Sequence, residues 1–470
     1  MALLAMIPMV FYFTTEGTWD LAKVLRKRGH AGVFFMAQAQ AITHGRLDVE
    51  RRDIPGECFD WKLRCYGYFG LTPSLLRLPF LAVLQRLRTA LTPLYLGIAV
   101  MLAYWGALRL LERSLVESTD PAPPRALVLG YAIAGSLALG PGGTLLFLTH
   151  PAVYEEAQAW GTAFFVLTLE RVWAWYGSRN PRPLIVAVLF GIAAANARPT
   201  AASACGALGV VVFFLSCFGA SPAGVEEAAA GDPRRVAGPR RGGWRVAVAA
   251  ACLALLPGLT AGGVFWLKFD TPVPDWRLNE QISERPWWRA VLSNNGDRTT
   301  GFLFTPTALV AYFRPDSVVR RPAWPFFGFR FPGEPILWVP PLPRGGAYVE
   351  PVASLTTTMP LPWALNVMVA LWLAVNAGKL PRGQWILAAG SLASAAAMIL
   401  LTVTTVTITN RYLGDFFAIS AVGVALGHRV VFPLLRERPI LSGSVGLLAL
   451  LLVAWSVLVT LALNTRLIFG

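Results

Sequence analysis

Long apolar runs separated by polar segments recur along the whole sequence. Most runs are about 16–24 residues long, near the roughly 20 residues that a helix needs to cross a bilayer. The pattern therefore predicts an all-α polytopic membrane protein with about eleven transmembrane helices, in which residues 1–470 form a single membrane domain. The predicted helices cover 1–14, 93–111, 126–149, 158–176, 183–197, 201–219, 246–268, 362–377, 385–408, 416–432 and 441–465.

Three polar segments are longer than ordinary connections. Residues 15–92 mix charged, aromatic and apolar residues, which is typical of helices that lie on a membrane surface. Residues 270–361 are rich in proline, glycine and tryptophan, and we expect them to form an ordered loop cap. Residues 220–245 combine alanine, glycine, proline and arginine, a composition that indicates a flexible linker.

The charge distribution assigns these segments to the two sides of the membrane. Charged residues make up only 14% of the chain, hydrophobic residues 55%, and the mean hydropathy is +0.53. The net charge of +15 does not indicate a nucleic-acid partner, because the basic residues lie mostly in short segments between apolar runs, as on the cytoplasmic side of membrane proteins. We therefore predict a multi-pass plasma-membrane protein with a cytoplasmic linker at 220–245 and with the loops 15–92 and 270–361 outside.

One basic segment opposes this orientation. Lys23, Arg26, Lys27 and Arg28 follow the first apolar run and would lie outside. That run is only about 14 residues long, below the range of about 17–25 residues for spanning helices. The predicted orientation therefore depends on the later loops.

Cysteine and histidine residues offer little evidence of a metal site. Cys58 and Cys65 share the first long loop, where a disulfide bond and two free thiols are both compatible with the sequence. The four histidines are scattered and no Cys-x-x-Cys is present, which argues against an intrinsic zinc site. A divalent cation bound in another way stays open. No nucleotide-phosphate loop is present either, so a soluble nucleotide donor is unsupported.

Ionisable residues gather at the predicted outer ends of the apolar runs, where such side chains are costly and often functional. The clusters are Glu16 with Asp20, His150 with Tyr154, Glu155 and Glu156, Arg198 alone, and Arg411 with Tyr412 and Asp415. Each also has a simpler interpretation. A carboxylate near the interface is often solvated or paired, and Arg411 with Asp415 at i, i+4 is compatible with a helix-surface ion pair.

Together these clusters suit sugar transfer at the membrane surface. A carboxylate can act as the general base that takes the proton of an acceptor hydroxyl. Arginine suits a leaving phosphate, whose growing negative charge it meets with paired donors. A lipid-phosphate donor would also explain why the site lies at the membrane edge.

Several segments resemble one known group of proteins, in chain order. These segments are 34–49, the pair Gly56 and Glu57, and the ranges 66–79, 153–161, 197–200, 354–360 and 411–416. They resemble actinobacterial members of the GT-C superfamily, which are multi-span glycosyltransferases that use polyprenyl-phosphate sugars.

The resemblance implies a GT-C-like fold and specific roles for residues within or beside these segments. Glu156 matches a second-loop acid, with Glu155 beside it as a further candidate, and Arg411 and Asp415 match a donor-side motif. Because Arg198 lies like Arg411 at the outer end of a span, we expect Arg198, Arg411, Tyr412 and Asp415 to bind the donor phosphate. Gln38, His150 and Tyr154 are expected to bind substrate. The similar proteins carry an acid where this sequence has Met36, so either Asp20 or Glu57 supplies the base or the chain is a noncatalytic relative.

We therefore predict an inverting membrane glycosyltransferase whose active site faces outward. Its donor is a polyprenyl-phosphate sugar, and its acceptor is a glycan, lipid or protein of the cell envelope. A transporter or lipid flippase, or a noncatalytic relative acting as a scaffold, are the alternatives. A cavity beneath both long loops that holds Glu155, Glu156 and Asp415 would favour the enzyme.

Overall fold

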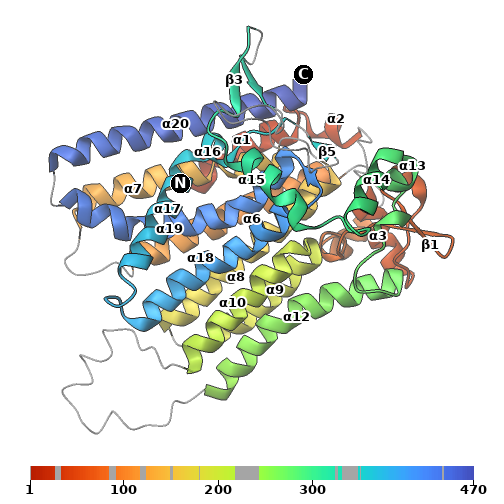
Figure 1. Ribbon diagram of the computed structural model, residues 1–470, viewed down its shortest axis with the longest axis horizontal. Helices are drawn as coiled ribbons and strands as arrows, with labels where there is room; N and C mark the ends of the chain where they lie inside the picture. The colour runs from red at the N-terminus through yellow and green to blue at the C-terminus, as the bar shows by residue number, and fades with distance from the viewer. Residues whose placement is uncertain are drawn as a thin grey trace.

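A bundle of long helices forms the body of the protein in the computed structural model (Figure 1). The structure describes residues 2–26, 33–83, 91–116, 123–148, 152–178, 180–217, 243–322, 326–330, 348–349, 351–436 and 439–469. The linker predicted at 220–245 lies almost entirely outside the described residues.

Each predicted transmembrane range overlaps one helix of the bundle. The helices are α1 (Ala2–Thr14), α6 (Thr92–Val116), α7 (Arg125–Leu139), α8 (Val153–Ser178), α9 (Arg182–Ala197), α10 (Thr200–Cys217), α12 (Gly243–Phe269), α17 (Pro360–Val375), α18 (Arg382–Val403), α19 (Phe417–Arg436) and α20 (Pro439–Phe469). Within the described residues, seven helical segments are long and apolar enough to cross a membrane. The chain is therefore a multi-pass membrane protein, and the number of eleven crossings stays a prediction.

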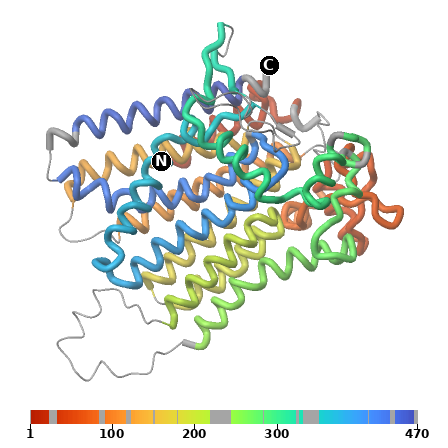
Figure 2. Tube along the Cα trace, viewed as in Figure 1, coloured from red at the N-terminus to blue at the C-terminus, as the bar shows by residue number. Residues whose placement is uncertain are grey.

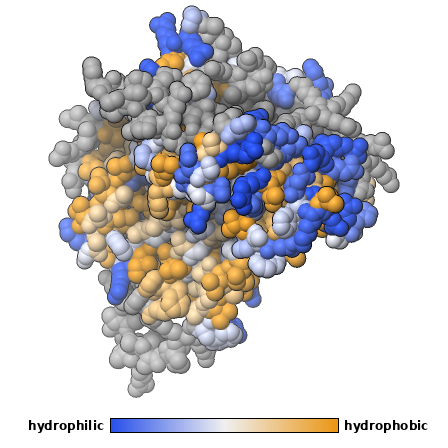
Figure 3. Space-filling view, turned by 45° about the vertical axis from the view of Figure 1, so that its right-hand side comes forward, coloured by the Kyte–Doolittle hydropathy of each residue, from blue (hydrophilic) through white to orange (hydrophobic). Residues whose placement is uncertain are grey.

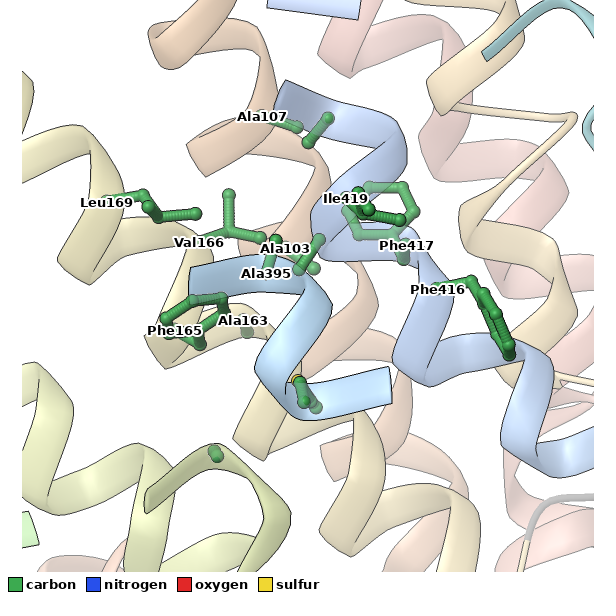
Figure 4. Packing of buried hydrophobic residues seen from close by; sticks show 14 of the residues in the cluster. Ala103, Ala107, Ala163, Phe165, Val166, Leu169, Ala395, Phe416, Phe417 and Ile419 are labelled. Atoms are coloured by element: carbon green, nitrogen blue, oxygen red, sulfur yellow. The ribbon is translucent and has the colours of Figure 1, made fainter. Parts of the chain in front are cut away.

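Helix α8 is enclosed by its neighbours. Nearly all of its residues are buried, and α6 and α9 pack along it. Figure 4 shows Ala103 and Ala107 of α6 and Val166 of α8 within one buried core, where small alanine side chains allow close helix packing. At the far end of α8, the buried carboxylate of Glu170 pairs with Arg113, which explains how a charged residue is accommodated there.

The first long loop is folded rather than extended. It contains α2 (Leu21–Arg26), α3 (Phe34–Thr43), the 3-10 turn η1 (Arg51–Asp53), the strands β1 (Phe59–Trp61) and β2 (Arg64–Tyr66), α4 (Thr72–Leu75) and η2 (Leu78–Phe80). The two strands form an antiparallel hairpin with Phe59 opposite Tyr66. A disulfide bond between Cys58 and Cys65 closes the base of this hairpin.

The second long loop also contains short elements. They are η5 (Trp276–Leu278), α13 (Glu280–Glu284), α14 (Pro286–Asn294), η6 (Phe302–Phe304), α15 (Thr305–Phe313), β3 (Val318–Arg320), β4 (Phe327–Phe329), β5 (Tyr348–Val349) and α16 (Leu355–Thr358). Strands β3 and β4 are antiparallel, and β5 pairs in parallel with β6 (Thr407–Ile408). The chain is therefore mostly helical but not all-α, because the loops form three small sheets in its described part.

The two long loops pack on each other at one end of the bundle. The backbone N–H of Glu280 donates to the carbonyl of Cys58 at 2.9 Å, and Phe59 and Asn279 form a β-bridge. Lys62 at the hairpin tip pairs with Asp270 at 2.5 Å. In Figures 1 and 2, β1, α3, α13 and α14 accordingly lie together.

The helix ends that flank the short basic segments lie at the opposite end of the bundle from the long loops. Helix α10 ends, and α12 and α18 begin, at the end away from α13, α14 and β1 (Figure 2). Figure 3 shows hydrophobic residues gathered over the bundle and hydrophilic residues over the loop end. This arrangement fits a bundle in a membrane with the long loops in water.

Candidate active site

A cavity of about 830 Å³ lies where the two long loops meet the ends of the helices. Its walls come from both long loops, from the starts of α8 and α10, from α12, and from the segment 401–412. The helical wall is apolar and the loop wall is aromatic and polar. The cavity has the size of a small-molecule site and holds several charged groups.

Glu57, in the first long loop, is one of the residues that line this cavity. Its side chain is 7% exposed, and burial raises the pKa of the Glu57 carboxyl to about 7 because the charged form loses water. The positive charges of Arg411 and Arg285 act in the opposite direction and lower the pKa. A carboxyl with such a pKa can accept a proton near neutral pH.

The backbone around Glu57 is held from both sides. Gly56 has φ = +75°, a conformation that favours glycine, and its N–H donates to the Glu280 carboxylate at 3.2 Å. On the other side, Cys58 is held by its disulfide bond with Cys65 and by the Glu280 backbone. The second loop thus positions the acidic residue of the first.

Arg411 contributes a positive charge stacked on aromatic rings. It lies in the 3-10 helix η7 (Asn410–Phe416), directly before α19. Its guanidinium carbon lies 4.1 Å from the ring centre of Tyr154 and 5.8 Å from that of Tyr412. Stacking on a ring orients an arginine while keeping its charge. Arg411, Tyr154 and Tyr412 all line the cavity.

A second arginine, Arg198, is held by a buried carboxylate. Arg198 Nη2 donates to Asp415 Oδ2 at 2.6 Å, and Asp415 also accepts hydrogen bonds from Gln158 at 3.0 Å and Thr402 at 2.5 Å. Asp415 is fully buried, whereas the side chain of Arg198 is 16% exposed and lines the cavity. Three donors therefore fix the carboxylate that orients Arg198.

This arrangement differs from the ion pair that the spacing of Arg411 and Asp415 suggests. The sequence places them four residues apart, as in an α-helical surface pair. They lie in a 3-10 helix, in which side chains three residues apart align and those four apart do not. Asp415 pairs with Arg198, which lies in the turn between α9 and α10.

Tyr68 and Trp276 form an aromatic part of the cavity wall that the sequence did not indicate. Their ring centres lie 5.0 Å apart. The buried Lys268 donates to the carbonyl oxygens of Gly67 at 2.9 Å and Phe69 at 2.6 Å, and thereby holds Tyr68 in place. No short motif marks such a contact, because about 200 residues of sequence separate its partners.

Gly70 lets the same segment approach the end of α9. A Cβ atom at position 70 would lie 1.8 Å from the carbonyl oxygen of Asn196. Only glycine fits so close to another backbone. Because Asn196 precedes Arg198 by two residues, this approach brings the first loop next to the Arg198 turn.

Glu156 does not belong to the described cavity lining and pairs with Arg77 instead. The two groups form a fork with distances of 2.7 and 2.9 Å, and their side chains are 1% or less exposed. Arg77 also stacks at 4.0 Å over the ring of Tyr95. The packing therefore favours a structural role for Glu156, and its predicted catalytic role stays a prediction. The sequence feature that could have revealed this pair is Arg77, a single charged residue in the half-apolar stretch 71–79, which needs an acidic partner when it is buried.

Two other predicted residues lie away from the cavity lining. Gln38 is buried and accepts a hydrogen bond from Ser74 at 2.6 Å. Asp20 is exposed and accepts a hydrogen bond from the backbone of Lys23 at 3.0 Å, at the start of α2. These contacts give both residues local structural roles.

Three further positions entered the sequence-based prediction of the site: Glu155, His150 and Met36. Glu155 is buried in the first turn of α8, outside the residues that line the described cavity. His150 lies outside the described residues. Met36, where the resemblance leads us to expect an acid, is 9% exposed and packs in the main hydrophobic core. Of the two acids considered in its place, only Glu57 lines the cavity.

The donor set near the cavity does not suit a divalent cation. Among the described residues, no group of three His, Cys, Asp or Glu side chains is placed to hold a metal ion. Glu57 has two arginines for neighbours, and Asp415 is held by Arg198. These carboxylates are therefore placed to pair with arginine rather than to ligate a cation.

Comparison with known proteins identifies the fold. No family model matches the sequence, and no curated protein matches it significantly. The solved structure of the apo oligosaccharyltransferase of Archaeoglobus fulgidus matches with a TM-score of 0.52 and 14% identity. The AglB oligosaccharyltransferase from the same organism, in complex with an inhibitory peptide and a dolichol-phosphate, matches with a TM-score of 0.50 and 13% identity.

Both matches cover 99% of this chain and 55% of the archaeal chain. The protein thus spans about half the length of these structures. Its fold is similar to that of about half of the archaeal oligosaccharyltransferase chain.

Proposed function

We propose that this protein is a membrane glycosyltransferase of the GT-C type. It transfers a sugar from a polyprenyl-phosphate donor to a cell-envelope acceptor on the outer face of the plasma membrane. The observation that carries the proposal is one cavity that combines the buried carboxyl of Glu57 with the arginines Arg198 and Arg411. The fold shared with oligosaccharyltransferases supports the same reaction class.

The donor's phosphate would bind to Arg198 and Arg411. Both are permanently charged and can meet phosphate oxygens with paired N–H donors. The adjoining helical wall carries Gly258, Ala261 and Leu401, an apolar surface suited to the lipid chain. One archaeal neighbour binds a dolichol-phosphate, which agrees with a lipid-linked donor.

Glu57 would act as the general base of an inverting transfer. Its position in the cavity wall favours it over the exposed Asp20. As the acceptor's hydroxyl oxygen attacks the anomeric carbon, its proton passes to Glu57. The bond from that carbon to the phosphate oxygen breaks, and the electron pair leaves with the lipid phosphate. The arginines stabilise the charge that develops there.

The outward orientation of the site rests on the distribution of basic residues. The cavity lies at the end of the bundle that holds both long loops, whereas α10 ends, and α12 and α18 begin, at the opposite end. Cytoplasmic loops carry the excess of arginine and lysine. A transporter would place its ionisable groups near the middle of the bilayer. Glu155, Glu156 and Asp415 are not among the residues that line the cavity, so the criterion set on these three acids is not met. The enzyme is supported instead by Glu57, Arg198 and Arg411 in the cavity wall.

The test is transfer by the purified protein from a panel of polyprenyl-phosphate sugars, with Glu57→Gln as the diagnostic variant. We expect this change to lower kcat by about 10²–10⁴-fold while the protein stays folded, because the proton has no acceptor. Glu50→Gln, an exposed acid of the same loop, is the matched control and should transfer normally.

Two results would contradict the proposal at different levels. Normal turnover by Glu57→Gln would remove Glu57 from the mechanism. No transfer by folded wild-type protein from any donor of the panel would instead favour the noncatalytic alternative.

A further inference from the structure

An aromatic surface on the loop side of the cavity has no role in binding the donor phosphate. Trp276 of η5 and Tyr68 of the first loop both line the cavity, with their ring planes inclined by 54°. The face of an aromatic ring is negatively polarised and attracts C–H groups. The C–H face of a sugar ring is a suitable partner for such a surface.

Asn279 adds a polar group whose hydrogen bonding is incomplete. It lies three residues after Trp276, lines the cavity and is 2% exposed. Its side-chain amide lies beside the Glu57 carboxylate and lowers the pKa of that group, and no hydrogen bond of normal geometry satisfies Nδ2 within the described part of the chain. An amide nitrogen carries two N–H donors, and Glu57 can accept from only one of them, so the other is available to a ligand that brings an acceptor atom, such as a sugar hydroxyl.

Asn279, three residues after Trp276 in the second loop, lies beside the base. Glu57 interacts with Arg411, next to the proposed donor phosphate, and with Asn279 and Arg285 of the second loop. A general base must contact the attacking hydroxyl of the acceptor. The groups on the loop side of Glu57 are therefore placed to hold the acceptor.

We propose that the acceptor is a carbohydrate whose ring packs on Trp276 and Tyr68 and accepts a hydrogen bond from Asn279 Nδ2. This inference rests on the proposed function and selects among the glycan, lipid and protein acceptors. A second hydroxyl of the same acceptor loses its proton to Glu57 and bonds to the anomeric carbon of the donor sugar. The products are a new glycoside and the free polyprenyl phosphate.

The experiment compares acceptors and measures KM for each substrate separately. The acceptor probes are octyl glycosides of mannose, glucose and galactose, with an Asn-x-Thr peptide and dodecanol as rivals. We expect transfer to at least one glycoside. Trp276→Leu should raise the acceptor KM about tenfold, because an aromatic contact is lost, while the donor KM stays unchanged.

Matched variants separate recognition from loss of structure. Trp276→Phe keeps an aromatic face and should recover most of the acceptor affinity. Asn279→Leu removes the amide at similar size and should also raise the acceptor KM with the donor KM unchanged, so it carries the test if Trp276→Leu fails to fold. It should in addition move the pH midpoint of kcat/KM to higher pH, because the amide lowers the pKa of Glu57. Trp19→Leu, which removes an exposed tryptophan from the other part of the first loop, should leave both KM values unchanged.

The contradicting results are distinct. A rise in the donor KM instead of the acceptor KM would assign this surface to the donor's sugar and overturn the inference. Transfer to the peptide or to dodecanol, but to no glycoside, would overturn the carbohydrate acceptor while leaving the proposed function intact. No transfer from any donor to any acceptor would overturn both.

Discussion

Two buried arginine–carboxylate pairs have different surroundings in this protein. Arg77 and Glu156 are both enclosed, with side chains 1% or less exposed. In the other pair Asp415 is buried, but Arg198 is 16% exposed and lines the cavity. The same chemical pair can therefore join two segments of a fold in one place and present a positive charge to a ligand in another.

The partners of each carboxylate explain the difference. Both oxygens of Glu156 are bonded by the one guanidinium of Arg77. Asp415 divides its oxygens among Arg198, Gln158 and Thr402. In the first pair, the Arg77 guanidinium bonds to both oxygens of its acid and is enclosed. In the second pair, Gln158 and Thr402 also donate to Asp415, and Arg198 lines the cavity as well.

The largest expected effect comes from breaking the enclosed pair. Glu156→Gln leaves the Arg77 charge buried without its counter-charge, which should lower the free energy of unfolding by about 3–5 kcal/mol. Thermal unfolding of the solubilised protein would measure it. Adding Arg77→Met to the same chain removes the buried charge and should restore most of the stability. A Glu156→Gln protein that is stable but inactive would return Glu156 to the chemistry, as its sequence position suggests.

Substitution of Arg198 or Arg411, which line the cavity, should weaken donor binding more than it lowers the stability of the fold. Arg411→Lys and Arg198→Lys should each raise the donor KM and slow transfer by about 10–100-fold, because an ammonium cannot reproduce a paired grip on phosphate. Steady-state kinetics would check this, with the exposed Arg52→Lys as the control. Weakened acceptor binding with normal donor binding would show that the two sides of the site are reversed.

The smallest expected effect is a pH dependence of transfer, which arises from Glu57 in the cavity wall. Because burial raises the pKa of Glu57 to about 7, the base is protonated and inactive at lower pH. We therefore expect kcat/KM to reach a plateau above pH 8 and to lie about tenfold below it at pH 6. Removing the positive charge with Arg285→Gln should move the midpoint to higher pH, because Arg285 lowers the pKa. A flat profile between pH 5.5 and 8 would argue against Glu57 as the base.

The sequence predicted part of the site but few of its contacts. It identified Glu57, Tyr154, Arg198, Arg411 and Tyr412, which line one cavity. Tyr154, Arg198, Arg411 and Tyr412 are visible in sequence because charged and aromatic side chains at the ends of apolar runs are uncommon, whereas Glu57 came from the family resemblance. Glu156 was equally conspicuous in the sequence, yet it pairs with Arg77 and does not line the described cavity. Residues two positions apart on a helix, such as Tyr154 and Glu156, point in different directions.

The residues that the sequence missed act through distant partners. Trp276, Asn279 and Lys268 have no unusual local pattern. Lys268 acquires its role from carbonyl groups of the first loop, and Asn279 from its position beside Glu57. Such roles depend on which loops meet, and no spacing along the chain records that.

What the sequence alone determined is the division of the chain into membrane helices and polar loops. The apolar runs must be buried in lipid or in one another, and each must satisfy its own backbone hydrogen bonds as a helix, so local composition is enough. Only the tertiary structure decided which carboxylate is enclosed and which group is open to the cavity. That outcome depends on desolvation and on long-range pairing, as in Glu156 with Arg77 and Asp415 with Arg198, and both arise only when the helices and loops pack together.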